Sequence, residues 1–285
     1  LPTLSMGGWI RELPAMFEPS DIAWRSPDGL RALVEELARQ GRPLFLERLP
    51  ATSPTVAVLR QAFARRGLLK LEAAMPTPFI RIEGQGGLEH ILGSRRRADL
   101  RRAERRAERL GHISYEIHAP SDDFQLAGLL DEAYGLETRS WKYPTGTALT
   151  ADARQGAFFR RFARAASRDR HLRLAFLRID GKPVAMQIAS EWQQRFWLYK
   201  MSYDRTYAGC SPGQLLMHFT LNHALSQGLQ SYEFMGVMAD WTRLWTRDLR
   251  HYVQVRAIPY SLASLDMAAR RAVRGAFRRA RTLIT

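Results

Sequence analysis

The chain has 285 residues, 46% of them hydrophobic, so it can bury the core of one large domain or two small ones, and general disorder is excluded. Its 43 Lys and Arg against 28 Asp and Glu give a net charge of +15, which favours anionic partners such as phosphates, nucleic acid or lipid headgroups. Cys210 is the single cysteine, which excludes an intramolecular disulfide and a cysteine-based zinc site, and we expect no metal.

The sequence contains neither a run of about 20 apolar residues nor a secretory leader, so we expect a cytoplasmic protein. It does not begin with Met, which suggests that it starts inside a longer reading frame. Residues 94–110 carry eight Arg against three acids, and residues 267–285 carry six Arg and no acid. These two segments hold +11 of the +15, so the excess charge is concentrated rather than spread.

The first third predicts short alternating elements. They are a helix at 26–40, a strand at 43–49, a helix at 53–66 and strands at 68–73 and 79–82. This order indicates an α/β layer of its own, residues 1–83, followed by a hinge at "EGQGG" (Glu83–Gly87).

An arginine-rich helix follows the hinge at 94–110. Its few apolar residues recur at helical spacing and form a narrow seam: Leu100, Ala103, Ala107 and Leu110. A solvated helix leaning on the core is the simpler interpretation, and contact with nucleic acid is the alternative.

The remaining elements predict a mixed sheet. We expect a strand at 112–118, helices at 121–138 and 151–167, strands at 171–179, 182–192 and 195–203, a helix from 212, and strands at 231–235 and 251–258. Asp180-Gly181 favours a tight hairpin between the first two strands of the central group. The later strand–helix–strand order indicates a crossover, hence a sheet that is mostly antiparallel with one parallel pair.

"CSPGQLL" opens the crossover helix. Ser211 as N-cap, Pro212 at the first helical position and Gln214 at the third match a Ser-x-x-Gln capping box. Gly213 leaves room for a ligand, and the amides of Gly213, Gln214 and Leu215 would face a bound phosphate together with the positive end of the helix dipole. Taken alone, these residues fit an ordinary capped helix more often than a phosphate site.

Several segments carry a resemblance to a known family: "RRADLRRAERRAERLGHISYE", "RSWKYPTGTAL", "LRLAFLRIDGKPVAMQIA", "LYKMSYDRTYAGCSPGQLL" and "ALSQGLQSYEFMG". With "LPATSPTVAVLRQAFARRG" nearer the start, the chain resembles the cellulose-biosynthesis-associated, Fem-like branch of the GNAT acyltransferase superfamily. The resemblance implies mixed α/β folds in tandem, with an N-terminal GNAT-like half at 1–83 and a GNAT acyltransferase domain at 84–260 that binds acyl-CoA.

The chain departs from that pattern in three places. Glu233-Phe234 replaces the usual Asp-Phe, "ADWTRLWT" (Ala239–Thr246) replaces a Tyr-Lys pair, and the superfamily's stricter glycine-rich phosphate loop is absent. The resemblance implies an acyl-CoA site made of Ser211, Pro212, Gly213, Gln214 and Leu215, with Lys200 on the preceding strand.

Amide formation from a thioester needs a base for the amine proton and donors for the developing oxyanion, but no metal. Glu233 is the candidate base, because aromatic residues such as Trp197 around it would partly exclude water; a salt bridge to Lys200 or an arginine is an equal alternative. His218 is a second candidate that could relay a proton. Tyr203 could act as general acid for the thiolate. Cys210 is not expected to be a nucleophile.

Trp141 and Lys142, in the loop after the predicted helix at 121–138, resemble the family's acceptor-side segment, and Trp197 is a third substrate-binding candidate. All three are candidates for binding the amine acceptor. The sequence alone leaves the acceptor's identity open.

Residues 261–285 predict a basic amphipathic helix. One side gathers Leu265, Ala269, Ala272, Val273, Ala276, Phe277, Ala280, Leu283 and Ile284, and the other gathers Arg270, Arg274, Arg278 and Arg281. Such a helix suits an anionic bilayer surface, so we expect a peripheral protein on the cytoplasmic membrane. Packing on the core or a disordered tail are the alternatives.

The resembled branch includes bacterial enzymes that N-acylate sphingoid bases, which implies N-acylation of a lipidic amine in ceramide or sphingolipid biosynthesis. A sugar amine or an amino acid remains open as acceptor. Fem-type relatives use aminoacyl-tRNA, so a tRNA-dependent transferase is the rival hypothesis, with the helix at 94–110 binding tRNA phosphates.

Overall fold

The computed structural model describes residues 4–5, 20–84, 86–140 and 153–260. They fall into two compact units: residues up to 76 together with those from 250 onward, and residues 77–249. The predicted domain limits, 1–83, 84–260 and 261–285, refer to GNAT-like halves and stay a prediction, and residues 261–285 lie outside the described chain.

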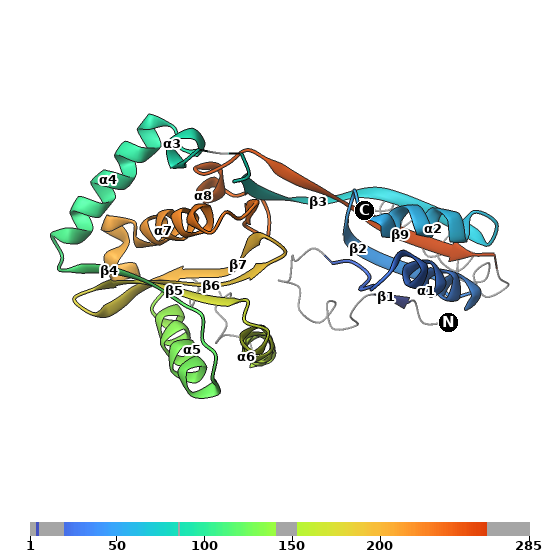
Figure 1. The fold of residues 1–285 in the computed structure, drawn as a ribbon, viewed down its shortest axis with the longest axis horizontal. Coiled ribbons are helices and arrows are strands. Elements are labelled where there is room, and N and C mark those ends of the chain that lie inside the picture. Colours follow the sequence, from blue (N-terminus) through green and yellow to red (C-terminus); the bar gives the residue numbers. More distant parts are fainter. Residues whose placement is uncertain (1–3, 6–19, 85, 141–152, 261–285) are drawn as a thin grey trace, which may run out of the picture. The chain divides into compact units, whose positions relative to one another are not determined.

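The first unit combines two helices with a small sheet (Figure 1). Its elements are β1 (Leu4–Ser5), α1 (Pro27–Arg39), β2 (Leu44–Pro50), α2 (Pro54–Phe63), the first part of β3 (Gly67–Arg81) and β9 (Leu249–Pro259). The strand order is β1-β2-β9-β3, with β2 and β9 antiparallel. Ser26 and Ser53 cap the two helices by accepting the amide hydrogens of Gly29 and Thr55, each at 3.1 Å, which explains the sharp helix starts.

The second unit holds the remaining elements. They are the end of β3, α3 (Leu88–Ile91), α4 (Ser94–Glu108), β4 (Ile113–His118), α5 (Asp123–Thr138), α6 (Ala153–Arg168), β5 (Leu172–Ile179), β6 (Lys182–Trp192), β7 (Arg195–Tyr203), a 3-10 helix (Arg205–Cys210), α7 (Pro212–Ser226), β8 (Ser231–Glu233) and α8 (Asp240–Arg243). The order of its described strands is β3-β8-β7-β6-β5-β4, and the only parallel pair among them is β7 with β8.

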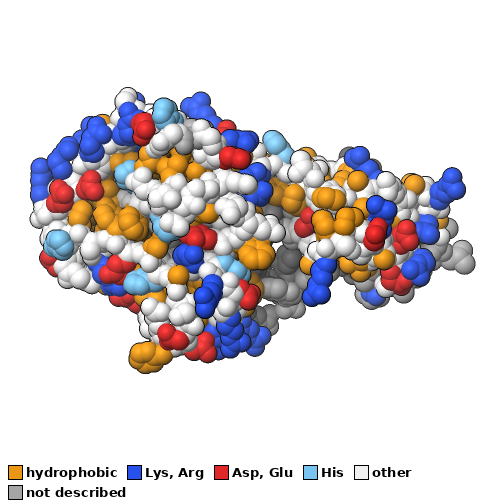
Figure 2. Space-filling model, viewed as in Figure 1, with side chains coloured by type: hydrophobic (Ala, Val, Ile, Leu, Met, Phe, Trp, Pro, Cys, Tyr) orange, Lys and Arg blue, Asp and Glu red, His pale blue; other side chains and the backbone are white. Residues whose placement is uncertain are grey.

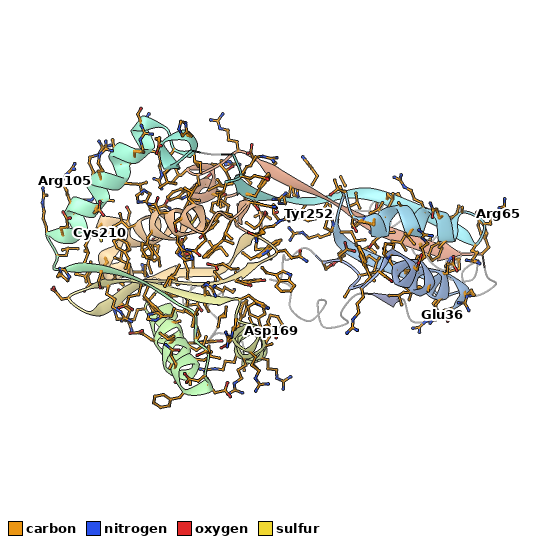
Figure 3. All side chains as sticks on the ribbon, in the orientation of Figure 1. Glu36, Arg65, Arg105, Asp169, Cys210 and Tyr252 are labelled. Carbon is orange, nitrogen blue, oxygen red and sulfur yellow. The ribbon has the colours of Figure 1, made fainter. Side chains whose placement is uncertain are left out.

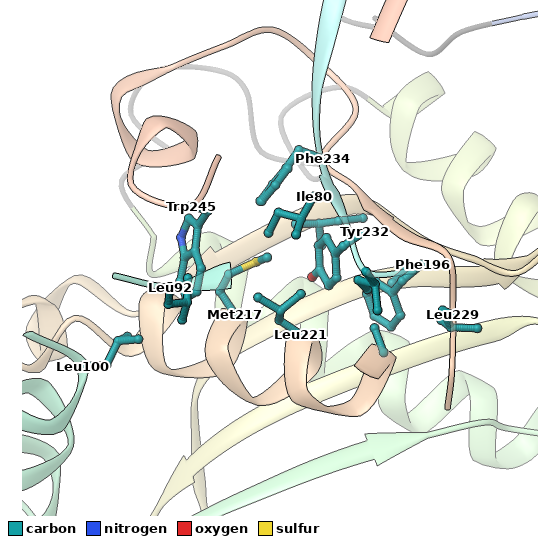
Figure 4. Packing of buried hydrophobic residues seen from close by; sticks show 14 residues of the cluster. Ile80, Leu92, Leu100, Phe196, Met217, Leu221, Leu229, Tyr232, Phe234 and Trp245 are labelled. Atoms are coloured by element: carbon teal, nitrogen blue, oxygen red, sulfur yellow. The ribbon is translucent and has the colours of Figure 1, made fainter. Parts of the chain in front are cut away.

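The predicted fold class is confirmed: the fold is mixed α/β, with a mostly antiparallel sheet flanked by helices. In the second unit α4 and α7 cover one face of the sheet, and α5 and α6 cover the other (Figure 1). We call these the α7 face and the α6 face. A cluster between α7 and the sheet contains Tyr232, Phe196, Met217 and Leu221 (Figure 4).

The hairpin between β5 and β6 follows its sequence signal closely. Asp180 and Gly181 have φ of 48° and 75°, so both central residues occupy the left-handed region that a two-residue hairpin turn requires. The Oδ1 of Asp180 also accepts the amide hydrogen of His112 at 2.7 Å. The turn is therefore held to the strand next to it.

β3 differs from the prediction of two separate strands, because it runs without interruption over 15 residues. Pro76 and Pro78 lie inside this strand, although proline cannot donate to a ladder. In the structure these prolines lie between the part of β3 next to β9 and the three residues, Phe79–Arg81, that pair with β8. The prolines thus coincide with the change of pairing partner, where fewer amide donors are needed.

A charged cluster lies beside the turn of the β6–β7 hairpin. Glu191 accepts from Arg173 and contacts His223 of α7, each at 2.6 Å, and its side chain is 13% exposed. Burial opposes ionisation, but the hydrogen bond with His223 and the charge of Arg173 outweigh it, so the pKa of Glu191 is lowered. A lowered folded-state pKa stabilises the protein above the ordinary glutamate range near 4.5, and this stabilisation is lost as the pH falls through the folded value.

We therefore expect Glu191→Gln to lower the free energy of unfolding at neutral pH by about 3 kcal/mol, because Arg173 would lose its carboxylate partner. Thermal melts at several pH values check this, with Glu108→Gln on exposed α4 surface as the matched control. The difference in melting temperature between wild type and Glu191→Gln should become smaller as the pH is lowered. A difference in melting temperature that does not change with pH would contradict a stabilising role for the Glu191 charge.

Candidate functional site

The parallel strands β7 and β8 pair over only three residue pairs, from Arg195 with Ser231 to Trp197 with Glu233. β8 ends there, whereas β7 continues to Tyr203. Among the described residues, no strand pairs with this edge of β7 beyond Trp197. We call Leu198–Tyr203, the part of β7 that no described strand flanks on this side, the open edge of β7, and an extended ligand could lie along it.

A β-bulge accompanies the separation of the two strands. Ile188 of β6 pairs with Lys200 and the next residue, Ala189, pairs with Leu198, so Tyr199 is the extra residue on β7. The Tyr199 ring lies against Phe162 of α6, with ring centroids 4.7 Å apart. A bulge bends the strand that carries it and increases its twist, which accounts for β7 leaving β8 at this point.

The first turn of α7 lies at the end of this open edge. Ser211 is in the left-handed region with φ 53°, and its side chain makes no capping hydrogen bond, so the predicted capping box is wrong. The amides of Gln214 and Leu215 both donate to Ser211 O, at 2.9 and 3.2 Å. Contrary to the prediction, these two amides therefore do not face a ligand, while no partner for the Gly213 amide occurs among the described residues.

Gly213 is buried and faces β7. A Cβ at this position would lie 3.3 Å from the Tyr203 ring and 3.7 Å from the sulfur of Met201. Only a residue without a side chain fits here without moving the ring. The structure thus joins two predicted site residues, Tyr203 and Gly213, at the α7 end of the open edge. The roles of Ser211–Leu215 in binding a donor stay predictions.

A polar cluster that sequence reasoning missed surrounds Gln214. Its Oε1 accepts from Arg96 of α4 and, at 2.8 Å, from Nε1 of Trp245. The guanidinium of Arg96 lies over the Trp245 ring, 4.5 Å from its centroid. The signal was in the sequence, because Arg96 precedes Leu100 by four residues and so continues the buried seam of α4.

His218 lies one turn along α7 from Gln214 and is half-buried. Burial, followed by the positive charge of Arg96, lowers the pKa of His218, so a neutral imidazole is favoured near neutral pH. A neutral imidazole can accept a proton, which keeps the predicted relay chemically possible.

Glu233 is the last residue of β8 and is 1% exposed. Its neighbour Tyr232 points into the cluster on the α7 face (Figure 4), and side chains alternate along a strand, so Glu233 lies on the α6 face. Ser231 Oγ donates to Glu233 Oε1 at 2.6 Å, and Trp197 pairs with Glu233 across the strands. The carboxylate therefore lies where β7 and β8 part.

The other predicted residues are spread along β7. Lys200 lies on the α6 face with its ammonium 5.2 Å from the Phe159 ring centroid, and Trp197 donates to Trp192 O at 3.1 Å. Tyr203 is six residues beyond Trp197, about 20 Å along an extended strand. Tyr203 and Glu233 therefore occupy opposite ends of the open edge. Trp141 and Lys142 lie outside the described residues.

A family model described as an acetyltransferase (GNAT) domain matches residues 94–243, more than half of the chain. The chain belongs to this family. It is therefore a GNAT-type acyltransferase, and the open edge of β7 and the start of α7 lie inside the matched domain. A search of curated proteins finds no match.

Three solved structures share the fold over both units. The C-terminal domain (DUF2156) of a putative lysylphosphatidylglycerol synthetase from Agrobacterium fabrum is 14% identical, with a TM-score of 0.55 over 85% of this chain and 76% of that one. L-PGS from Bacillus licheniformis is 12% identical, with a TM-score of 0.55 over 87% and 79%. FemX is 13% identical, with a TM-score of 0.53 over 81% and 77%. At these identities the likeness concerns the fold alone.

Within the described residues, no group of three or more His, Cys, Asp or Glu side chains could hold a metal ion. The described helices include none that is long and apolar enough to cross a membrane.

Proposed function

We propose that the chain transfers an acyl group from acyl-CoA directly to an amine. The observation that carries this proposal is the open edge of β7, which ends at the buried glycine that starts α7, inside the GNAT domain. An extended pantetheine arm fits along a strand edge through backbone hydrogen bonds. The diphosphate would lie against Gly213, where an unpaired amide and the positive end of the α7 dipole favour an anion.

This placement puts the thioester where β7 and β8 part, next to Glu233. The amine nitrogen attacks the thioester carbonyl, a C–N bond forms and the C–S bond breaks. We assign the amine proton to Glu233, and the thiolate leaves with a proton from solvent. A backbone amide of β7 near the bulge at Tyr199 would stabilise the oxyanion.

The other catalytic candidates take supporting roles in this scheme. Tyr203 contacts the Gly213 position, so we assign it to the diphosphate end rather than to the thiolate. His218 belongs to the same end and is a weaker candidate for proton transfer than Glu233. Trp197 and Lys200 lie on the α6 face, where the amine would approach.

We propose a lipidic amine, such as a sphingoid base, as the acceptor and a peripheral place on an anionic membrane for the protein. The support is the arginine-rich amphipathic pattern of residues 261–285, in which each basic residue near an anionic surface contributes about 1 kcal/mol. The resemblance to the cellulose-biosynthesis-associated, Fem-like branch is in keeping with this acceptor.

Removing the residues after Leu265 should therefore abolish flotation with anionic liposomes while leaving acyl transfer to a water-soluble amine intact. Flotation of the full and truncated chains measures this, and liposomes of neutral lipid are the control. If both forms float equally with anionic liposomes, the C-terminal segment is not the membrane anchor.

An aminoacyl-tRNA donor is the second candidate. It is favoured by the outer face of α4, where Arg95, Arg101, Arg105 and Arg109 are exposed and form no ion pair with a described carboxylate. Figure 2 shows Lys and Arg side chains gathered along the edge of the second unit where α4 lies, and Figure 3 shows Arg105 on the outer side of the helix. Such a face could follow a phosphate backbone.

Two parallel assays test the proposal. The first measures release of free thiol from acyl-CoA in the presence of candidate amines, and the second measures transfer from charged tRNA to the same amines. An acyl-CoA enzyme should release thiol and show a preferred chain length. Transfer from charged tRNA with no use of any acyl-CoA would replace the first candidate by the second.

A further inference from the structure

Arg96 is a partly buried cation with no carboxylate partner. None of the described carboxylates lies within ion-pair distance of its guanidinium; Asp99, the acid nearest in sequence, bonds Arg102 instead. Its Nε atom is buried and has no hydrogen-bond partner. Burial lowers the pKa of Arg96, as expected for a charge removed from water. Unpartnered charged atoms in a folded protein call for a specific cause.

The surroundings of Arg96 are also unfavourable for a lone cation. The side chain is held against Gln214 in the first turn of α7, where the helix dipole is positive, and His218 lies one turn away. A cation is disfavoured at a helix N-terminus and stabilised at a C-terminus. The fold nevertheless fixes Arg96 there, because Gln214 accepts its hydrogen bond and Trp245 stacks on its plane.

We propose that Arg96 binds a phosphate group of the acyl donor. A phosphate would pair the guanidinium charge, take up unused N–H donors and lie beside the free amide of Gly213. Arginine suits this role, because its planar fork binds phosphate oxygens in pairs and keeps its charge when buried. The stacking on Trp245 holds that fork in one orientation before the ligand arrives.

This inference rests on the proposed function for the identity of the acyl donor. The binding of a phosphate group by Arg96 does not depend on which donor carries that phosphate. The phosphate could come from the diphosphate of coenzyme A or from the backbone of a charged tRNA. Arg60 of α2 provides a comparison, since it is exposed, lies outside both candidate binding sites and forms no ion pair with a described carboxylate.

The inference is tested by measuring the binding of coenzyme A, inorganic pyrophosphate and pantetheine to the full chain, by calorimetric titration or by tryptophan fluorescence. Arg96→Gln should weaken coenzyme A and pyrophosphate by roughly 10- to 100-fold, as expected for a lost hydrogen-bonded charge. Pantetheine lacks the diphosphate, so its affinity should not change. Arg60→Gln should leave all three affinities within about twofold, since exposed charges contribute little.

Melting temperatures separate a ligand role from a structural one. Removing an unpaired charge should leave the melting temperature of Arg96→Gln unchanged or higher, and Arg96→Lys, which keeps the charge but loses the fork, should also weaken binding. A lower melting temperature with unchanged affinities would show that Arg96 only supports the fold, and overturn the inference.

The outcomes for the two proposals differ. If wild type binds coenzyme A and Arg96→Gln binds it equally well, this inference fails and the acyl-CoA function stands. If wild type ignores coenzyme A but binds pyrophosphate or charged tRNA through Arg96, the inference stands and the acyl-CoA donor fails. If wild type binds none of these, both fail.

Discussion

Replacing Glu233 by Gln is expected to lower kcat by roughly 10²- to 10⁴-fold, the usual contribution of a positioned general base. Gln keeps the shape of Glu and can still accept from Ser231, but it cannot take the amine proton. Glu233 lies on the α6 face and the first turn of α7 lies on the other, so binding of coenzyme A should hardly change. Steady-state kinetics and a binding titration on the same preparation measure both effects.

Glu233 is fully buried, so its replacement must be checked for folding by circular dichroism and thermal melting. Glu108→Gln removes the same charge from the exposed end of α4, far from Glu233 in the sequence, and should leave kcat unchanged. A folded Glu233→Gln protein that turns over at the wild-type rate would remove Glu233 from the mechanism. A salt-bridge role would then be the better interpretation.

Enlarging Gly213 should have the second large effect. Gly213→Glu places a carboxylate where the donor diphosphate would lie, and we expect a loss of affinity for coenzyme A of about 100-fold or more, from steric overlap and charge repulsion together. Gly213→Ala adds only a Cβ, 3.3 Å from the Tyr203 ring, and should cost about tenfold. Equilibrium titrations with coenzyme A give both values.

Gly209 offers the matched control, since a Cβ added there meets nothing within 4 Å. Gly209→Ala should therefore bind coenzyme A as wild type does. Alanine has a higher helix propensity than glycine, so the melting temperature of Gly213→Ala should not fall much. Equal affinities for wild type, Gly213→Ala and Gly213→Glu would exclude the start of α7 as the donor site.

Sequence periodicity predicted most of the second unit correctly. The strands at 172–179, 182–192 and 195–203 follow the alternation on both sides of Asp180-Gly181 almost to the residue. β5 and β6 are buried on both faces over most of their length, so their bounds are marked by runs of strand-forming residues and by the Asp-Gly turn, which are local properties of the sequence. The crossover helix α7 and the parallel pairing of β7 with β8 also follow from the order of the elements.

The features that shape the site were harder to predict, because they depend on contacts between distant segments. The bulge at Tyr199 appears only when β6 and β7 are paired. The capping box failed because Ser211 ends a 3-10 helix in a left-handed conformation, whereas a capping serine has an extended backbone. Gln214 then contacts Arg96, 118 residues earlier in the chain.

Hydrogen–deuterium exchange of the full chain with and without coenzyme A tests the central proposal most directly, because it locates the ligand on the backbone. The proposal predicts slower exchange at two places when coenzyme A is present: the open edge of β7 at Leu198–Tyr203, and the first turn of α7 at Gly213. Unchanged exchange at both places under saturating coenzyme A, or protection confined to other elements, would contradict it.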